Sequence, residues 1–115
     1  MPSLPYLQVR RQGDETFARF VDLDRLDEYN SDASGEELDR LAQDAPHTRL
    51  VLDLGNILYA SSSGLGNLVA LHRKVRSTGG RLVLANLSPA VAEVLAVTNL
   101  VRVLEVRGEH VAQAN

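Results

Sequence analysis

Two short, almost wholly apolar runs place the strongest limit on how this chain can fold. They read RLVLDL at residues 49–54 and RLVLA at residues 81–85. Continuous apolar runs of this length are typical of strands that are buried on both faces, as in parallel sheets. Each run is followed by a segment with helical spacing of apolar residues. We therefore predict parallel strands that are joined by right-handed helical crossovers.

The first crossover helix is predicted to follow the three serines at 61–63. Apolar residues recur at mostly helical spacing over residues 65–75, and the pair Gly79-Gly80 is a typical helix stop. A turn in this position joins a strand to a helix N-terminus, where backbone N–H groups are unpaired and negative charge is favoured.

The second crossover helix is predicted to begin at Ser88-Pro89. Serine is a good N-cap and proline suits the first helical position. Asn99 is expected to end this helix in the left-handed conformation, with Leu100 as the apolar contact after it. Residues 101–106 are predicted as the last strand. The tail from Gly108 is expected to be a short helix or an irregular segment.

The N-terminal part predicts an antiparallel edge. Residues 1–13 are expected to be a frayed start or an edge strand, and residues 16–22 are rich in the residue types that favour strands. Together with the later elements they predict an α/β fold. Its sheet is small, mixed and largely parallel, with about four or five strands packed with about four helices.

A first helix is predicted between these two parts of the chain. Ser34 and Glu37 have the spacing of a capping box, so Ser34 is expected to be the N-cap, although Asn30 or Ser31 offers an earlier start. Pro46 follows, and the helix is expected to end near Ala45.

Length and composition exclude several classes of protein. The chain of 115 residues predicts a single domain over 1–115, with its core at about residues 14–107. It has no cysteine, no apolar run long enough to span a membrane and no signal-peptide pattern, so a cytoplasmic protein without membrane insertion is expected. A net charge of -3 and 4% aromatic residues disfavour a nucleic-acid partner.

The serine cluster YASSSGLGNL at residues 59–68 has three interpretations. In the first, one of Ser61, Ser62 and Ser63 caps the helix. In the second, one of them accepts a phosphate. In the third, the cluster supplies a nucleophile or forms part of a nucleotide-binding loop. The third interpretation is disfavoured because no glycine stands two residues before a serine as in a nucleophile elbow. The third glycine of a dinucleotide fingerprint and the lysine of a P-loop are also missing.

The remaining charged residues carry no motif. The basic residues of the 62–78 helix (His72, Arg73, Lys74 and Arg76) are expected to form a solvated face, and the acidic stretch at residues 22–28 lacks the calcium-loop pattern. The histidines at 47, 72 and 110 have no metal-ligand spacing. We expect neither a metal nor a cofactor.

Four segments in order carry a family resemblance: VLDL, SSGLG, GGRLVLANLSP and TNL. They resemble the STAS domain of bacterial anti-sigma factor antagonists over roughly residues 14–107. The resemblance implies a small non-enzymatic switch. Such a protein binds an anti-sigma factor that is itself a GHKL-type serine kinase, and it is released when that kinase phosphorylates a serine in the turn. A PP2C-type phosphatase restores the unphosphorylated state.

Carried over position by position, the resemblance places the phosphoserine on Ser62. Ser61 and Ser63 are the alternative phosphoacceptors, and Asp27 matches the acidic residue before the first helix. Ser61 itself stands where the family has an aspartate, and Gly55-Asn56 replaces a serine-containing turn. The expected partner-binding residues are Asp27, Ser61, Ser62, Ser63, Gly64, Leu65, Gly66 and Asn67.

Two other functions stay open at this point. The chain fits a permanent STAS subunit of a larger assembly, such as a lipid-transport ABC complex or a stressosome, in which the 62–78 helix packs without any phosphate. A nucleotide-binding role for the serine-glycine turn is the other alternative.

Overall fold

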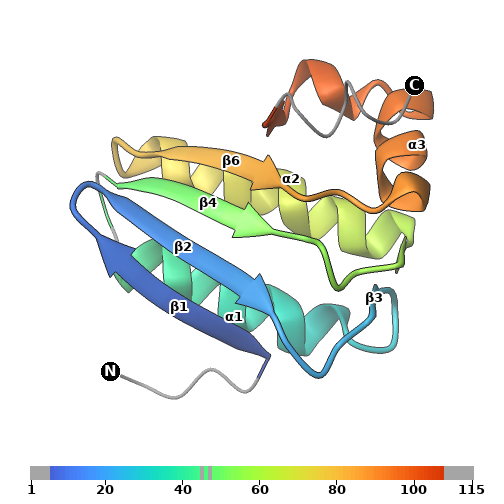
Figure 1. Ribbon diagram of the computed structural model, residues 1–115, viewed down its shortest axis with the longest axis horizontal. Helices are drawn as coiled ribbons and strands as arrows, with labels where there is room; N and C mark the ends of the chain where they lie inside the picture. The colour runs from blue at the N-terminus through green and yellow to red at the C-terminus, as the bar shows by residue number, and fades with distance from the viewer. Residues whose placement is uncertain (1–5, 45, 47, 108–115) are drawn as a thin grey trace.

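A computed structural model describes residues 6–44, 46 and 48–107 (Figure 1). The elements in chain order are β1 (Leu7–Gln12), β2 (Glu15–Phe20), β3 (Arg25–Leu26), α1 (Ser31–Asp44), β4 (Arg49–Asp53), β5 (Tyr59–Ala60), α2 (Ser62–Ser77), β6 (Arg81–Ala85), α3 (Pro89–Val97), the 3₁₀ turn η1 (Leu100–Arg102) and β7 (Glu105–Val106).

The main sheet has five strands in the order β1-β2-β4-β6-β7. β1 and β2 form an antiparallel hairpin at one edge, and all other neighbours in this sheet are parallel. The apolar runs at 49–54 and 81–85 supply the central strands β4 and β6, as predicted. The α/β class and the mixed, largely parallel sheet are therefore confirmed.

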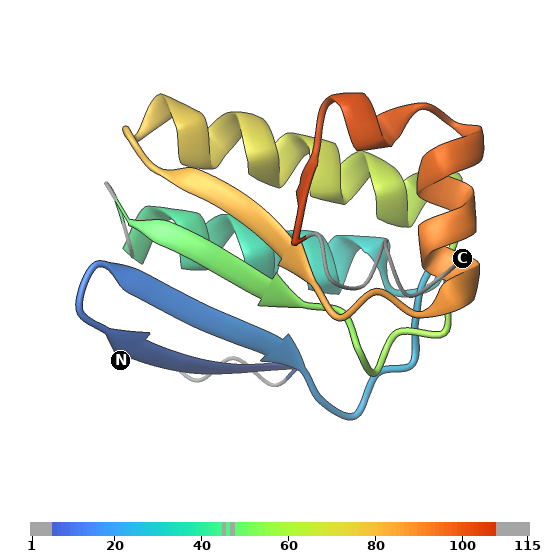
Figure 2. The ribbon, with the colours of Figure 1, turned by 45° about the horizontal axis from the view of Figure 1, so that its top comes forward.

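Helices α1 and α2 lie side by side against one face of this sheet (Figure 2). The strands turn Leu50, Leu52, Leu82 and Leu84 toward them, and these side chains are almost completely buried with the inner stripes of both helices. Side chains alternate between the two faces of a strand, so the residues between these leucines face the other side. α3 lies at the end of the sheet where α2 begins (Figure 2).

α1 begins at Ser31, three residues before the predicted cap. Ser34 lies inside the helix, where it is buried and its N–H donates to the carbonyl of Asn30. Glu37 accepts a hydrogen bond from the N–H of Tyr6 at 2.9 Å instead of closing a capping box. The carboxylate that the spacing had assigned to the helix start therefore binds the residue just before β1 instead. The earlier start, which the sequence left open, is the one observed.

The predicted strand at residues 101–106 is wrong in its first half. Asn99 ends α3 with φ at 62°, as expected, but the chain then forms η1, and only Glu105–Val106 pairs with β6. Amide N–H groups of residues 103 and 104 donate back to the carbonyl of Leu100, which prevents an extended conformation there. The described residues hold three α-helices rather than about four, and the tail from Gly108 lies outside them.

A second, two-stranded sheet was not predicted. β3 and β5 pair in parallel, with Arg25 opposite Tyr59 and Leu26 opposite Ala60. β3 lies in the acidic stretch at residues 22–28, where polar and charged residues give no pattern that predicts a two-residue strand. This small sheet joins the segment before α1 to the segment before α2.

Ion pairs bind neighbouring elements of the fold. Lys74 of α2 contacts Asp39 of α1, so this part of the expected solvated face is a helix–helix contact. Arg81 of β6 donates to Glu105 of β7. The hydrogen bond from Arg81 holds the pKa of the Glu105 carboxyl below its ordinary value, and the same bond raises the pKa of the guanidinium. The pair thus ties the short last strand to the sheet.

Candidate functional site

The serine turn lies where the small sheet meets the start of α2 (Figure 1). Ser61 follows β5 directly, and its N–H donates to the carbonyl of Leu26 in β3 at 2.8 Å. The first turn of α2 therefore rests on the segment that precedes α1. The position of every residue in the turn depends on the pairing of β3 with β5.

Ser61 is the N-cap of α2. Its backbone is extended, with φ -85° and ψ 177°, and its Oγ accepts a hydrogen bond from the N–H of Gly64 at 3.4 Å. The carbonyl of Ser61 accepts the first helical bond from Leu65 at 2.9 Å. Among the three serines that the sequence could not separate, the capping role falls on Ser61. Serine and aspartate are both good N-caps, so the departure from the family aspartate preserves the helix start.

Substituting the cap is expected to destabilise the domain modestly. We predict that Ser61→Ala lowers the free energy of unfolding by about 1 kcal/mol, because an N–H of the first turn loses its acceptor. Urea unfolding measures the change, and Ser61→Asp is the matched control that should retain stability. A Ser61→Ala protein as stable as the natural one would contradict the assignment of the cap.

Ser62 and Ser63 occupy the first two positions of α2 and are both exposed. The hydroxyl of Ser62 has no hydrogen-bond partner within the described part of the chain. α2 is 16 residues long, and the positive end of its dipole favours an anion at these positions. A serine hydroxyl that is exposed, and that makes no hydrogen bond within the described fold, is chemically suited to accept a phosphate.

The two glycines of the turn have opposite surroundings. A Cβ added at Gly64 would lie 2.3 Å from the carbonyl oxygen of Leu26 and 2.6 Å from its Cβ. Gly64 is therefore required for the close packing of α2 on β3. At Gly66 an added Cβ would meet no atom within 4 Å, and the residue is exposed. The fold of this chain gives no packing reason for a glycine at position 66.

The substitution Gly66→Ala is expected to stabilise the protein by about 0.5–1 kcal/mol, because alanine is a better helix former than glycine. Thermal unfolding measures this change. If Gly66 serves the close approach of a partner, the same variant should bind that partner more weakly despite its higher stability. A fall in stability would show that position 66 has a structural constraint that its open surroundings do not reveal.

Leu65 and Asn67 face inward rather than outward. Leu65 belongs to the core, with 6% of its surface exposed. The side-chain amide of Asn67 donates to the carbonyl of Ser31 at 2.8 Å and lies against Gly35. Both residues fix α2 relative to its surroundings. Any role that they have in binding a partner is therefore exerted through the position of the helix.

Asp27 lies directly after β3 and is buried. Its carboxylate accepts from the N–H of Tyr29 at 3.0 Å and lies 3.8 Å from the guanidinium of Arg25. The N–H of Asp27 donates to the side chain of Asn30 at 3.2 Å. Because Leu26 bonds to Ser61, Asp27 and the serine turn flank the same backbone hydrogen bond. The structure thus brings together the two parts of the predicted site.

Exposed apolar side chains lie in the two chain segments that pair beside the turn, and sequence reasoning missed them. Leu58 and Tyr59 are exposed at β5, and Tyr29 is almost fully exposed two residues after Asp27. The N–H of Leu58 donates to the carbonyl of Asp24 at 2.7 Å, which holds this segment beside β3. Exposed aromatic residues are common in protein interfaces. Aromatic residues beside an exposed turn are the signal that a closer reading of the sequence could have used.

Two other kinds of feature, a metal site and a membrane-spanning helix, were sought among the described residues. No group of three histidine, aspartate or glutamate side chains there is placed to hold a metal ion. His72 is partly buried, and His47 and His110 lie outside those ranges. None of the helices described has the length and apolar character needed to cross a membrane.

The comparison with protein families is decisive for the class of the protein. The family model described as the STAS domain matches residues 11–114, and the chain belongs to that family. A solved anti-sigma-factor antagonist (STAS) domain protein from Planctomyces limnophilus superposes with a TM-score of 0.78 at 22% identity, over 94% of this chain and 97% of that one. At this identity the likeness shows the fold.

Curated relatives carry the name anti-sigma factor antagonist. The anti-sigma F factor antagonist of Paenibacillus polymyxa is 26% identical over 81 residues, which cover 70% of this chain and 69% of that protein. BtrV of Bordetella bronchiseptica, provisionally named an anti-sigma factor antagonist, is 35% identical over 71 residues. That match covers 62% of this chain and 61% of BtrV, so the chain spans about three fifths of that relative. The family resemblance of the sequence is confirmed: this is a STAS domain like those of anti-sigma factor antagonists.

Proposed function

We propose that this protein is a non-enzymatic switch that binds an anti-sigma factor and is released from it when Ser62 is phosphorylated. One observation carries the proposal: Ser61 performs the capping, which leaves Ser62 exposed on the first turn of α2 with no structural role. The names of the curated relatives supply the class of partner.

The proposed partner is an anti-sigma factor with a GHKL-type serine kinase fold. It transfers the terminal phosphoryl group of ATP to Oγ of Ser62, whose proton is lost while ADP leaves. A PP2C-type phosphatase then hydrolyses the phosphate ester and restores the hydroxyl. The STAS domain is only the substrate of both reactions: its hydroxyl accepts the phosphoryl group from ATP, and its phosphate ester is later hydrolysed by water. The partner enzymes supply the catalysis.

The proposed docking surface comprises the first turn of α2, the exposed face of that helix and the exposed side chains beside it. Tyr29, Leu58 and Tyr59 provide apolar contact area. Three exposed carboxylates lie nearby: Asp24 just before β3, Glu28 between β3 and α1, and Asp32 in the first turn of α1. Arg25 pairs with Asp24, and the excess of carboxylates leaves this end of the molecule acidic. Charge complementarity therefore favours a basic surface on the partner.

Phosphorylation is expected to change binding without unfolding the domain. A phosphate adds about -1.5 to -2 charge, and a helix N-terminus stabilises negative charge. In the complex, the same charge would enter an interface from which water is excluded, where an unpaired charge is costly. The domain therefore stays folded while the complex dissociates.

A binding titration tests the proposed function. The full chain is titrated with the purified kinase-type anti-sigma factor of the same genome, first with ADP and then with ATP and magnesium. We expect a one-to-one complex with ADP, and with ATP we expect loss of the complex as one phosphate per chain appears. A complex that persists unchanged in ATP, with no phosphate gained, would contradict the switch and favour a permanent STAS subunit.

A further inference from the structure

Arg73 lies on the same exposed stripe of α2 as Ser62, toward the opposite end of the helix. Residues four, seven or eleven positions apart return to nearly the same side of an α-helix, because one turn takes about 3.6 residues. Ser62, Gly66 and Arg73 have these separations, and all three are exposed. Leu68 and Leu71 of the main core occupy the other side of the helix. The stripe therefore faces away from the sheet over about three turns of α2.

The positive charge of Arg73 is not neutralised within the described part of the chain. No carboxylate there lies within ion-pair distance of its guanidinium. The adjacent Lys74 instead faces α1, where Asp39 pairs with it. Of these two neighbouring cations, Arg73 is the one that keeps a charge for a partner to bind.

The opposite sign of charge prevails around the start of α2. Asp32 and Glu36 are exposed on the first half of α1, in addition to the exposed Asp24 and Glu28 before this helix. α1 and α2 lie side by side, and each joins two parallel strands, so both helices begin at the same end of the sheet (Figure 2). The docking surface is therefore acidic where α2 begins and basic at Arg73.

The two ends of this surface act as separate electrostatic contacts. At about 1.5 Å of rise per residue, the eleven positions from Ser62 to Arg73 span roughly 16 Å of the helix. That length exceeds the Debye length of about 8 Å at physiological ionic strength. A phosphate on Ser62 is thus largely screened from Arg73, and the free charge serves a contact of its own.

We propose that Arg73 orients the anti-sigma factor by contacting an acidic patch on it, a role that rests on the proposed function. The partner then presents basic residues to the start of α2 and carboxylates to the far end of the stripe. In a reversed orientation like charges would meet at both ends, which costs free energy and slows association. A polyanion such as nucleic acid fits this surface poorly, because the exposed carboxylates near Ser62 would repel it.

Association kinetics of the full chain with the purified anti-sigma factor, measured with ADP, test this role. Arg73→Glu should lower the association rate constant about tenfold at low ionic strength, because charges at an interface steer the encounter. Arg73→Gln removes the charge without reversing it and should have a smaller effect. Both differences from the natural protein should shrink as salt is added, because exposed charges are screened.

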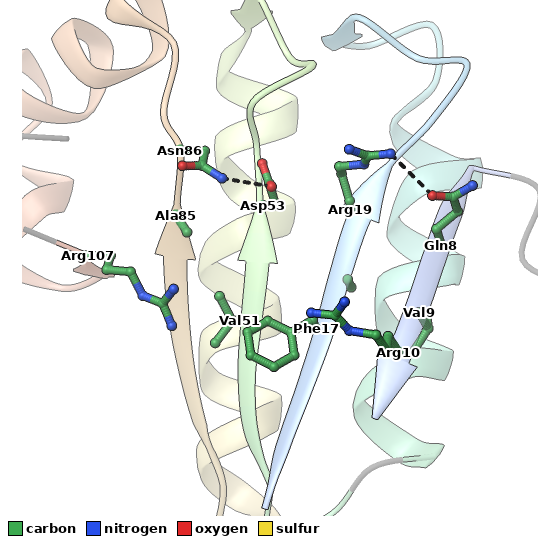
Figure 3. A pocket seen from close by; sticks show the side chains of 11 residues that line it. Gln8, Val9, Arg10, Phe17, Arg19, Val51, Asp53, Ala85, Asn86 and Arg107 are labelled. Carbon is green, nitrogen blue, oxygen red and sulfur yellow. Dashed lines mark hydrogen bonds between the residues drawn. The ribbon is translucent and has the colours of Figure 1, made fainter. Parts of the chain in front are cut away.

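Arg10→Glu is the matched control, because it makes the same change of net charge on another face of the molecule. Figure 3 shows Arg10 beside Phe17, with its guanidinium 5.1 Å from the ring centroid. Ala18 belongs to the main core, so Phe17 and the opposite Arg10 face the side of the sheet away from α1 and α2. This variant should associate at the natural rate. Circular dichroism verifies that each variant is folded.

The effect of Arg73 is expected to be independent of the phosphoacceptor. Ser62→Asp and Arg73→Glu should weaken binding by factors that multiply in the double variant, because substitutions at distant sites are usually additive in free energy. With saturating anti-sigma factor and ATP, the Arg73→Glu protein should still gain one phosphate per chain. Orientation by Arg73 and release by phosphate are thus measured separately.

Several results would overturn the role of Arg73. An Arg73→Glu protein that associates at the natural rate, in a complex that phosphorylation still dissolves, would remove this role and leave the switch in place. Faster association of the same variant would show that the partner is basic at this point. Equal slowing by Arg10→Glu would show a general effect of net charge. A natural protein that forms no complex would contradict the proposed function and the role of Arg73 together.

Discussion

Ser62→Asp is expected to weaken binding of the anti-sigma factor on the order of 100-fold, the cost of an unpaired charge in an interface. Ser62→Ala is expected to bind as the natural protein does. Neither variant should lose appreciable stability, because Ser61 and not Ser62 caps α2. Aspartate in the first turn of a helix also interacts favourably with the helix dipole. The two substitutions thus separate binding from stability.

The measurement is a pair of titrations with the same partner, together with urea unfolding of each variant. Ser63→Asp is the comparison, because it places the same charge on the exposed neighbour of Ser62 within the same docking surface. A loss confined to Ser62→Asp would locate the sensitive contact at that residue. Binding that follows the stability of the variants, and not the charge at position 62, would show that the serine turn acts only as a helix start.

Gly64→Ala is expected to destabilise the domain by about 3 kcal/mol, near the upper end of the usual cost of overpacking. In a domain of this size, that corresponds to a fall in Tm of roughly 10–20 °C. The added Cβ would lie 2.3 Å from the carbonyl oxygen of Leu26, which is backbone and cannot rotate away. That carbonyl also accepts the hydrogen bond from Ser61, so α2 and β3 must separate to admit the methyl group.

Calorimetric unfolding of Gly64→Ala beside Gly66→Ala measures this effect. The two positions lie in the same helix and receive the same substitution, and only Gly64 is in close contact with another segment. We expect shifts of Tm in opposite directions. Equal shifts would contradict the conclusion that the first turn of α2 packs against β3.

The sequence predicts most of the main sheet because its central strands are marked by local composition. The runs at 49–54 and 81–85 are apolar on both faces, and the observed strands follow them to within one residue. Ser88 accepts from the N–H of Val91 at 3.4 Å as the N-cap of α3, and Asn99 is left-handed as predicted. These features depend on interactions within a few residues, which a single sequence records well.

Elements that depend on distant contacts were predicted less well. β3 and β5 have two residues each and exist because they pair with each other, so neither has a local signal. The hydrogen bond from Tyr6 to Glu37 spans 31 residues and competes with the local capping pattern at Ser34. Between residues 101 and 103, valines that favour strands instead lie in or beside a 3₁₀ turn, since the chain folds back on Leu100.

In the candidate site, too, some features could be predicted from the sequence and others depend on contacts between distant segments. The resemblance selected the serine turn and Asp27 together, although more than thirty positions separate them in the sequence. Only the pairing of Leu26 with Ala60 explains why they are neighbours. The structure also assigns distinct roles to residues that look alike, since Ser61 is a cap, Ser62 is exposed, Gly64 is packed and Gly66 is not. The packing of Gly64 on Leu26 is a tertiary contact, and the cap of Ser61 is a local hydrogen bond to Gly64. The repeated serines and glycines do not show by themselves which residue takes which role.

The most direct test of the proposed switch is intact-mass and peptide mass spectrometry of the protein isolated from its own cells. The proposal predicts a fraction of chains that carry one phosphate, with the modified peptide assigning it to Ser62. A phosphate on Ser63 would support a switch at this turn but would contradict the assignment of the phosphoacceptor to Ser62. An unmodified protein under several growth conditions, in cells that contain the active kinase partner, would contradict control by phosphorylation.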